Sequence, residues 1–288
     1  MKFRERYESM GLQLIDPNTF QYQDRFSCVR YIQLQNMHNQ EETPVLGVYT
    51  KPNRPETSYR FQTTVSEEYE FQGNEVINEG IRSSIREFGS PIFEEFVILS
   101  PNLTSMRAEI LVRNSSSVPA VGDVYPQITI LNSYNGTSAK KISFGISLYQ
   151  GGKRIVGFSF GITKLLVMRQ IHIQNARTFA STISSYVNLF TENIVDLIRI
   201  NMQNRLDEST ILSTLDLVEN IGKRKRAEIS NMLTEITKES GNSLTGWDLF
   251  LAITKFSTVE TNINSKTLLE NIAERVLVLP ESMFRVLS

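Results

Sequence analysis

The spacing of hydrophobic residues changes a little past the middle of the chain. Up to about residue 165, short runs of aromatic and β-branched residues are separated by Pro, Gly, Ser and Asn, which is typical of β-strands. One segment differs, because apolar residues from Asn74 onward recur every three or four positions until Gly89 and Pro91, and this predicts a helix. The predicted strands are residues 59–66, 93–100, 106–112, 125–131, 141–149 and 154–162.

From about residue 172 the hydrophobic period is helical. It predicts one long helix of roughly 30 residues, about 45 Å at 1.5 Å per residue. Further helices are predicted at residues 208–220, 224–239, 246–256 and 265–276. In the third of these, Trp247, Phe250, Ile253 and Phe256 follow one flank, so we expect them to be buried.

The order of these elements predicts an α+β fold. An N-terminal β-rich part contains a β-α-β-β element and further antiparallel strands, and a long helix and a helical C-terminal part follow it. We expect a β-rich α+β domain at residues 1–170 and a helical region at residues 171–288 packed on it. A single domain remains an open alternative.

Composition favours a folded protein that stays in the cytoplasm. Hydrophobic residues make up 40% and charged residues 21% of the chain, unlike the composition of disordered proteins. No apolar run approaches the roughly 18 residues of a membrane span, and the N-terminus lacks the apolar stretch of a secretion signal. The single cysteine, Cys28, fits a reducing compartment.

Charge is distributed unevenly, although the formal net charge is only −1. The stretch from Val124 to Thr191 contains seven basic residues and no Asp or Glu. With 31 acidic residues in 288, a window of this length would hold about seven acids by chance. Because carboxylates repel a phosphate backbone, a basic surface without them indicates a polyanion site.

The acid-free stretch supplies the predicted nucleic-acid contacts. Phosphate contacts are expected from Lys140, Lys141, Lys153, Arg154, Arg169 and Arg177, and base stacking from Tyr134 and Tyr149. An alternative is that the aromatic residues are core and the basic residues pair with acids of residues 1–100. A second basic run, Lys223 to Arg226, is typical of a solvated helix end, with a nucleic-acid or targeting patch as the alternative.

Enzyme motifs are weak in this sequence. Residues 157–161 match the G-x-S-x-G pattern, but the chain has only two histidines, and no acid lies between Ser159 and His172 as the α/β-hydrolase order requires. The glycines are more typical of a bulge or a tightly packed strand. No His and Cys spacing indicates a metal site. We predict no catalytic residues, no metal and no cofactor, and whether the chain is an enzyme stays open.

Three segments resemble the phage/plasmid-like family, an uncharacterised group encoded on bacteriophages and plasmids. They are residues 121–136 (VGDVYPQITILNSYNG), 168–172 (MRQIH) and 244–256 (LTGWDLFLAITKF), and together the matches extend over residues 59–265. Leu251 stands where the family usually has Asn, Lys255 where it has Glu, and residues 149–152 replace a cysteine-asparagine-glycine turn. The resemblance implies a mobile genetic element as the setting and the host bacterial cytoplasm as the location.

These observations predict a nucleic-acid-binding protein of a phage or mobile element. It would bind single-stranded or recombining DNA through a basic surface, by analogy with phage single-strand annealing proteins that combine a small sheet, a long helix and a basic groove. The alternative is a protein-binding inhibitor of host defence without nucleic-acid binding. Nucleic acid, expected to be DNA, is the predicted partner; a homo-oligomer and a host protein stay open, and no membrane is expected.

Overall fold

The computed structural model describes residues 12–16, 19–23, 25, 27–35, 42–66, 71, 73–87, 89, 91–134, 141–160, 187, 193–240 and 243–286, with the side chains of 42, 76 and 278–286 left aside. The chain divides into two compact units. Unit 1 consists of Met1–Ser83, Val97–Ala108 and Ile130–Lys141, and unit 2 of Ser84–Phe96, Glu109–Thr129 and Ile142–Ser288.

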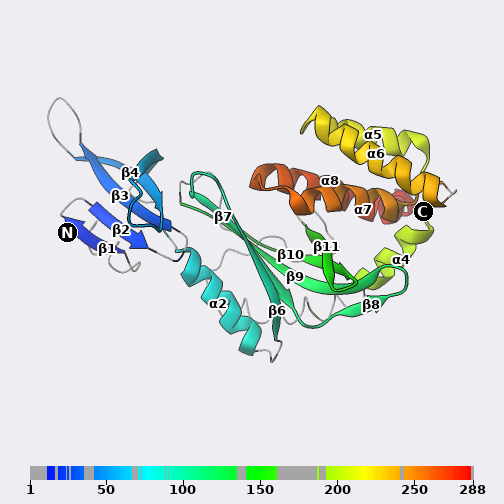
Figure 1. Cartoon of the computed structure of the whole chain (residues 1–288), viewed down its shortest axis with the longest axis horizontal. Helices are drawn as coiled ribbons and strands as arrows, with labels where there is room; N and C mark the ends of the chain where they lie inside the picture. Colours follow the sequence, from blue (N-terminus) through cyan, green and yellow to red (C-terminus); the bar gives the residue numbers. More distant parts are fainter. Residues whose placement is uncertain are drawn as a thin grey trace. The chain divides into compact units, whose positions relative to one another are not determined.

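Unit 1 is built on a five-stranded antiparallel sheet in which each strand pairs with the next along the chain (Figure 1). Its strands are β1 (Gln13–Asp16), β2 (Thr19–Gln23), β3 (Ser27–Gln35), β4 (Glu42–Pro52) and β5 (Arg60–Ser66). The predicted strand at residues 59–66 is confirmed as β5. The hydrophobic pattern did not single out β1 to β4.

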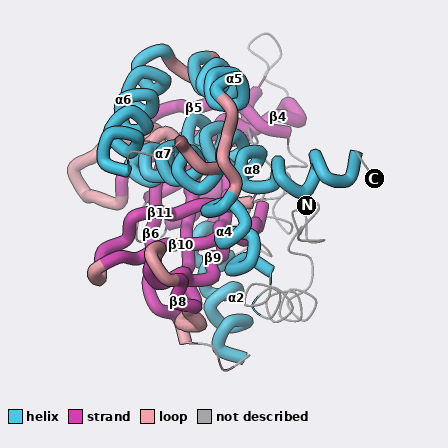
Figure 2. Tube along the Cα trace, turned by 90° about the vertical axis from the view of Figure 1, so that its right-hand side faces the viewer, coloured by secondary structure: helices cyan, strands magenta, loops and turns pink. Residues whose placement is uncertain are grey.

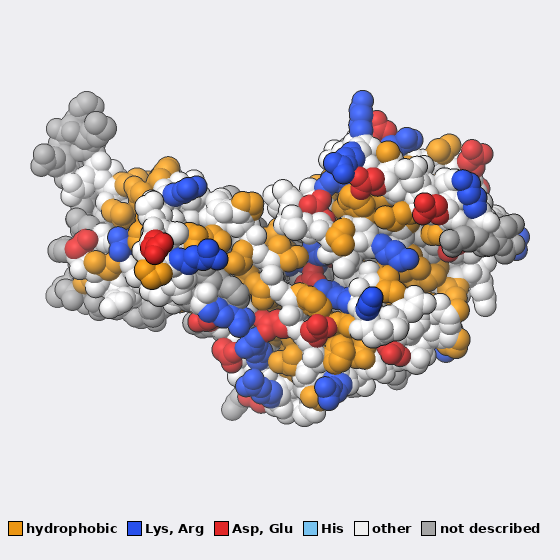
Figure 3. All heavy atoms as spheres, viewed as in Figure 1, with side chains coloured by type: hydrophobic (Ala, Val, Ile, Leu, Met, Phe, Trp, Pro, Cys, Tyr) orange, Lys and Arg blue, Asp and Glu red, His pale blue; other side chains and the backbone are white. Residues whose placement is uncertain are grey.

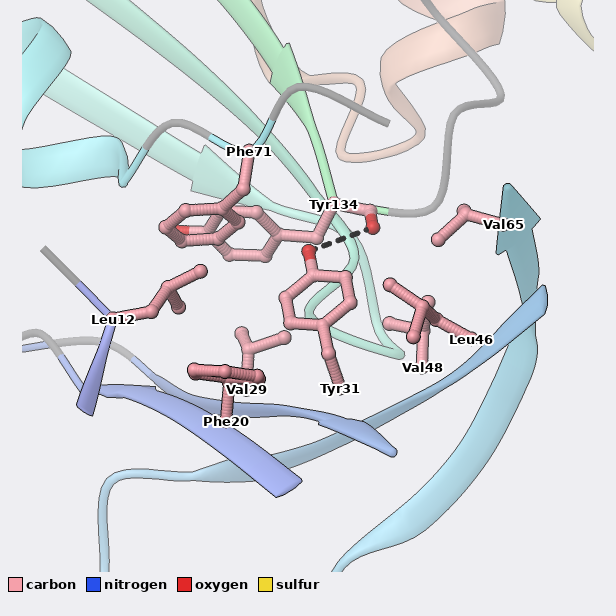
Figure 4. Close-up of a cluster of buried hydrophobic side chains, with 9 residues drawn as sticks. All are labelled: Leu12, Phe20, Val29, Tyr31, Leu46, Val48, Val65, Phe71 and Tyr134. Carbon is pink, nitrogen blue, oxygen red and sulfur yellow. Dashed lines mark hydrogen bonds between the residues drawn. The ribbon is translucent and has the colours of Figure 1, made fainter. Parts of the chain in front are cut away.

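One face of this sheet carries a hydrophobic core. Successive side chains of a strand point to opposite faces, and Val29, Tyr31, Leu46 and Val48 are all fully buried on the same side. The core consists of Leu12, Phe20, Val29, Tyr31, Leu46, Val48, Val65, Phe71 and Tyr134 (Figure 4). The Tyr31 hydroxyl donates to the Tyr134 carbonyl oxygen at 3.1 Å, so the core also contains a buried polar contact.

Helix α2 (Asn74–Glu87) confirms the helix predicted after Asn74. At its start, Asn74 Oδ1 accepts from Asn132 Nδ2 at 2.9 Å. The Asn74 backbone N–H donates to the Tyr134 hydroxyl at 3.0 Å. Gly89 ends the helix with φ of 68°, in the left-handed region that favours glycine.

A second sheet has the strand order β11-β10-β9-β7-β6, and β8 pairs with β9. Its strands are β6 (Ile92–Leu99), β7 (Ser105–Val112), β8 (Ser116–Val118), β9 (Gly122–Ser133), β10 (Lys141–Gln150) and β11 (Lys153–Ser159). Every strand predicted after residue 90 is present. Gly151 and Gly152 have φ of 57° and 74° and make the tight turn between β10 and β11, as their pairing predicts.

In unit 2 the C-terminal helices pack beside β11 (Figures 1 and 2). They are α4 (Val195–Gln203), α5 (Glu208–Glu219), α6 (Lys223–Ser240), α7 (Gly246–Val259) and α8 (Ile263–Val286). Helix α7 contacts β11, and α8 packs on α7, while α5 and α6 pair with each other. Thr258 of α7 accepts from the Gly157 N–H of β11 at 2.9 Å, which satisfies a donor on the edge strand of the sheet.

Helix α7 confirms the burial predicted for its aromatic flank. Thr245 and Asp248 form a capping box at its start, so the helix begins at residue 246, as predicted. Trp247 stacks on Phe250 at 5.1 Å between ring centroids, and Phe250 contacts Phe158 of β11 edge to face at 5.1 Å. Trp247, Phe250 and Ile253 are buried, and Phe256 is half-buried.

The α+β fold class is confirmed, with antiparallel sheets first and helices at the C-terminal end. The long helix predicted from residue 172 lies mostly outside the described residues, which include α4 at its C-terminal end. The predicted boundary at residue 170 also lies outside them. Among the described helices, none combines the length and the apolar character that crossing a membrane requires.

We expect Phe250→Ala to lower the free energy of unfolding by about 3–5 kcal/mol, because the ring is fully buried between Trp247 and Phe158. Chemical denaturation measures this difference. Val259→Ala in the same helix is the control, since Val259 is 75% exposed, and it should change stability by less than about 0.5 kcal/mol. Equal effects of the two substitutions would contradict the packing of α7 on β11.

Candidate nucleic-acid interface

The structure describes three of the seven basic residues of the acid-free stretch. Lys141 is half-buried at the start of β10, and Lys153 is exposed at the start of β11. Because Lys153 pairs with Gln150, the last residue of β10, the two lysines stand at opposite ends of that strand. The remaining four, Lys140, Lys164, Arg169 and Arg177, lie outside the described residues.

Arg154 points into unit 2, and its predicted exposure is wrong. Its side chain is 10% exposed, and Nη2 lies 2.5 Å from Glu109 Oε2. Nη2 also donates to Gln127 Oε1 at 2.8 Å, and Nε donates to Ser147 Oγ at 3.0 Å. Since these contacts hold the guanidinium inside the unit, Arg154 is removed from the predicted phosphate contacts.

Glu109 is buried with a second cation. Its Oε1 lies 3.6 Å from Lys266 Nζ, and the side chains of both residues are 1% exposed. Lys266 Nζ also donates to the Ser257 carbonyl oxygen at 2.9 Å. A buried carboxylate needs such partners, because removing its charge from water costs several kcal/mol. Deleting one partner of a buried ion pair typically destabilises a protein by about 3–5 kcal/mol. The alternative of internal ion pairing therefore describes Arg154, although its partner lies beyond residues 1–100.

The two predicted stacking residues are buried. Tyr134 is 1% exposed and stacks on Phe71 in the core of unit 1, with 5.4 Å between ring centroids. Tyr149 is 7% exposed and packs edge to face against Phe93 and Tyr125, and its hydroxyl donates to Glu94. Burial, and then the hydrogen bond to Glu94, raise the pKa of Tyr149 well above its usual value. A base stacks on an exposed ring, so neither tyrosine is a stacking platform.

The basic run from Lys223 to Arg226 is largely matched by acids. Arg224 pairs with Glu228 one turn later at 2.7 Å, and Arg226 pairs with Asp216 at 3.2 Å and Glu219 at 3.1 Å. Lys225 pairs with Glu260. Burial by itself raises the pKa of Glu260, but hydrogen bonds from Lys225 and the Asn262 N–H outweigh it, so that pKa is lowered. These pairs favour the interpretation as a helix end.

The sequence analysis missed a different surface, the side of β2 to β5 opposite the hydrophobic core, which we call the outer face. In the strand register Gln21 pairs with Arg30, Arg30 with Tyr49, and Tyr49 with Phe61. Paired residues share a face, so these four side chains form a row across four strands. The Tyr49 and Phe61 rings meet edge to face with 5.3 Å between centroids, and Phe61 is 54% exposed.

Tyr59 adds a third ring to the outer face. The Arg30 guanidinium carbon lies 4.0 Å from its ring centroid, and Lys51 Nζ lies 5.2 Å from it. Both the Tyr59 hydroxyl and Arg30 Nε donate to Gln21 Oε1 at 2.9 Å. Burial raises the pKa of Tyr59 although Arg30 opposes the shift, so the hydroxyl keeps the proton that it donates. These contacts fix the guanidinium against an aromatic ring.

The alternation of polar and apolar residues in β3 does not reveal this face. In residues 28–34 the sequence Cys-Val-Arg-Tyr-Ile-Gln-Leu mixes polar and apolar side chains on both sides, so period two does not separate core from surface there. In β4, Gly47 lies beneath the Tyr49 and Phe61 rings, where an added Cβ would come within 3.0 Å of Tyr49. Figure 3 shows hydrophobic and basic side chains next to one another on the surface of unit 1.

The described residues contain no cluster of three or more His, Cys, Asp or Glu side chains suited to a metal. Ser159 of the G-x-S-x-G motif is 5% exposed, and its hydroxyl hydrogen-bonds with Thr129 and Gln127 of β9. His38 and His172 both lie outside the described residues. The motif serine is thus part of a buried polar layer of the sheet.

Arg154→Ala should destabilise the protein by about 3 kcal/mol, because it leaves Glu109 buried with one of its cations removed. Lys153→Ala is the matched control. Lys153 is next to Arg154 in the sequence but is exposed, so this substitution should change stability by less than about 0.5 kcal/mol. Thermal and chemical denaturation measure both. If both substitutions changed stability by less than about 0.5 kcal/mol, the buried ion pair of Arg154 with Glu109 would be contradicted.

Comparison with known proteins gives no relative: no family model, no curated protein and no solved structure matches this chain.

Proposed function

We propose that this chain binds single-stranded nucleic acid across the outer face of unit 1. The observation that carries the proposal is the row of Arg30, Tyr49 and Phe61, which places a fixed guanidinium beside two aromatic rings on the side of the sheet away from the core. Single strands offer unpaired bases for rings and phosphates for cations, and this surface has both kinds of partner.

The aromatic side chains of the row are suited to binding single-stranded nucleic acid without preference for its base sequence. Stacking of a base on an aromatic ring is worth about 1–3 kcal/mol and tolerates every base, because each has a π-face. Phe61 is the most exposed ring of the row, so it is the principal stacking residue. Arg30 and Lys51 flank Tyr59 and supply positive charge for the backbone.

The described outer-face positions of β2 to β5 carry no carboxylate. Register and alternation place on this face Thr19, Gln21, Gln23, Cys28, Arg30, Ile32, Leu34, Val45, Gly47, Tyr49, Lys51, Phe61, Thr64 and Ser66. None of these positions is Asp or Glu, so the row itself does not repel phosphate; one acid, Asp16, pairs with Thr19 from the neighbouring strand β1. The apolar members supply contact area for bases, and the glutamines supply donors and acceptors.

The acid-free stretch from Val124 to Thr191 supports a second, electrostatic contact. Lys153 is exposed there, and Lys140, Lys141, Arg169 and Arg177 stay predicted phosphate contacts. The resemblance to the phage/plasmid-like family suggests the setting, in which the bound strand belongs to replicating or recombining DNA of a mobile element. These two supports are independent of the outer face.

We expect Phe61→Ala to weaken binding of a single-stranded oligonucleotide by about 1–3 kcal/mol, the worth of one stacked base. Fluorescence anisotropy with a labelled thymidine oligonucleotide measures the change. Leu268→Ala in α8 is the control, because Leu268 is 50% exposed and lies in unit 2, and its affinity should equal that of the wild type. A wild-type protein that binds no nucleic acid would favour the inhibitor of host defence.

The salt dependence of binding separates the two surfaces. If the two cations of the outer face, Arg30 and Lys51, touch phosphates, log affinity should fall against log salt with a slope of about −1.4, and Lys51→Ala should reduce it by about 0.7. Lys153→Ala should reduce the slope by about 0.7 as well if the acid-free stretch takes part. Arg224→Ala is the control, since this side chain is 92% exposed on α6. An unchanged slope in Lys51→Ala would contradict binding on the outer face.

A further inference from the structure

Arg30 is a cation of the outer face whose side chain is held in place by its neighbours. It lies within β3, and its register partners Gln21 and Tyr49 stand on the same side of the sheet, opposite the core. We infer that Arg30 recognises a guanine base of the bound strand through parallel hydrogen bonds from its terminal nitrogens, Nη1 and Nη2. The inference rests on the proposed function and names the base that the outer face prefers.

Two neighbours fix the guanidinium of Arg30. Its Nε donates to Gln21 Oε1 at 2.9 Å, and its central carbon lies 4.0 Å from the centroid of the Tyr59 ring. Gln21 is fixed in turn, because the Tyr59 hydroxyl donates to the same oxygen at 2.9 Å. An arginine nitrogen can only donate, so the amide atom that faces Nε must be the oxygen. The contacts at Nε and at the flat side of the guanidinium leave its Nη end for a ligand.

The Nη1 and Nη2 groups of Arg30 keep their hydrogen-bonding capacity. Within the ranges that the structure describes, Arg30 forms no ion pair with a carboxylate, and its hydrogen bond runs from Nε to Gln21. The residue is half-buried, so part of its side chain reaches solvent. The two nitrogens form a planar fork that donates and never accepts. A ligand that satisfies the fork must present two acceptors side by side.

Guanine presents such a pair of acceptors, O6 and N7, on one edge. An arginine bonded to both atoms is the commonest base-specific contact of proteins with DNA. Adenine has a donor, its N6 amino group, beside N7, and thymine has a methyl group beside O4. On a strand of thymidine alone, the fork of Arg30 is therefore left to phosphate oxygens. On a strand that contains guanine, it can exchange a phosphate for a base edge.

The position of Arg30 in the row favours a base edge over a phosphate. A base that stacks on the ring of Tyr49 or Phe61 lies against the face of the sheet, and the sugar–phosphate backbone then lies farther out. Neighbouring strands are about 4.8 Å apart, so Arg30 on β3 and Phe61 on β5 are about 10 Å apart across the row. One strand can thus place one base on Phe61 and the edge of another base at Arg30. Lys51, which pairs with Cys28 outside the row, stays available for the backbone.

The test compares thymidine oligonucleotides of equal length that carry one central guanine, adenine or 7-deazaguanine. In 7-deazaguanine a C–H group replaces N7, so one acceptor of the guanine edge is lost. We expect the full chain to bind the guanine strand about tenfold tighter than the other two, because each of these lacks one charge-assisted hydrogen bond to the fork. Fluorescence anisotropy measures the three affinities.

Arg30→Lys separates the fork from the charge. Lysine keeps the positive charge but has no planar fork, so the variant should bind the three strands equally and keep its affinity for thymidine alone. Arg113→Lys is the matched control, because Arg113 is exposed in unit 2, and the guanine preference should stay about tenfold. Salt titration gives an independent readout: exchange of one phosphate for guanine should make the salt slope shallower by about 0.7 than on thymidine alone.

The outcomes separate the base preference from the proposed function. Equal binding of the guanine, adenine and 7-deazaguanine strands by the wild type overturns the inference. If Phe61→Ala still weakens binding in that case, the proposed function survives and only the guanine preference is lost. A preference that Arg30→Lys retains overturns the role of Arg30. A wild-type protein that binds none of the strands overturns the proposed function and the inference together.

Discussion

The strict alternation of side chains in the first sheet is the constraint on which its surface depends. Tyr31 enters the core, where its hydroxyl bonds the Tyr134 carbonyl oxygen, and so Arg30 must point to the other side. A shift of one residue in β3 would bury Arg30 and expose Tyr31. The core thereby fixes the register, and the register assembles the row on the outer face.

In the proposed function, the outer face offers a nucleic-acid strand two kinds of contact. Tyr49, Phe61 and Tyr59 offer ring surface, while Arg30 and Lys51 offer charge that is held in place by Tyr59 and Gln21. Preorganised groups of this kind lose little side-chain freedom on binding, so contacts of modest individual strength remain available as affinity.

In unit 2, some basic side chains form ion pairs in the interior, whereas others are exposed at the surface. Arg154 and Lys266 both approach the buried Glu109, and a layer of Gln127, Ser147, Thr129 and Ser159 connects to the same guanidinium. Such a layer is stable only when its members are bonded to one another. A charge bias along the sequence therefore overstates the charge at the surface: of two adjacent basic residues, Lys153 is exposed and Arg154 is paired with Glu109 inside the unit.

The sequence by itself determined the α+β class, helix α2 with its stop at Gly89, the Gly151–Gly152 hairpin and the buried flank of α7, because local periodicity and turn chemistry decide each of them. It also identified the acid-free stretch. Only the tertiary structure decided which side chains are accessible: Arg154 meets Glu109 across 45 positions, Tyr134 meets Tyr31 across 103, and the row of Arg30, Tyr49 and Phe61 joins three strands. Partners distant in sequence decide which side chains are buried and which side of the sheet is covered. A strand that mixes polar and apolar residues on both of its faces does not reveal which face its neighbours will cover.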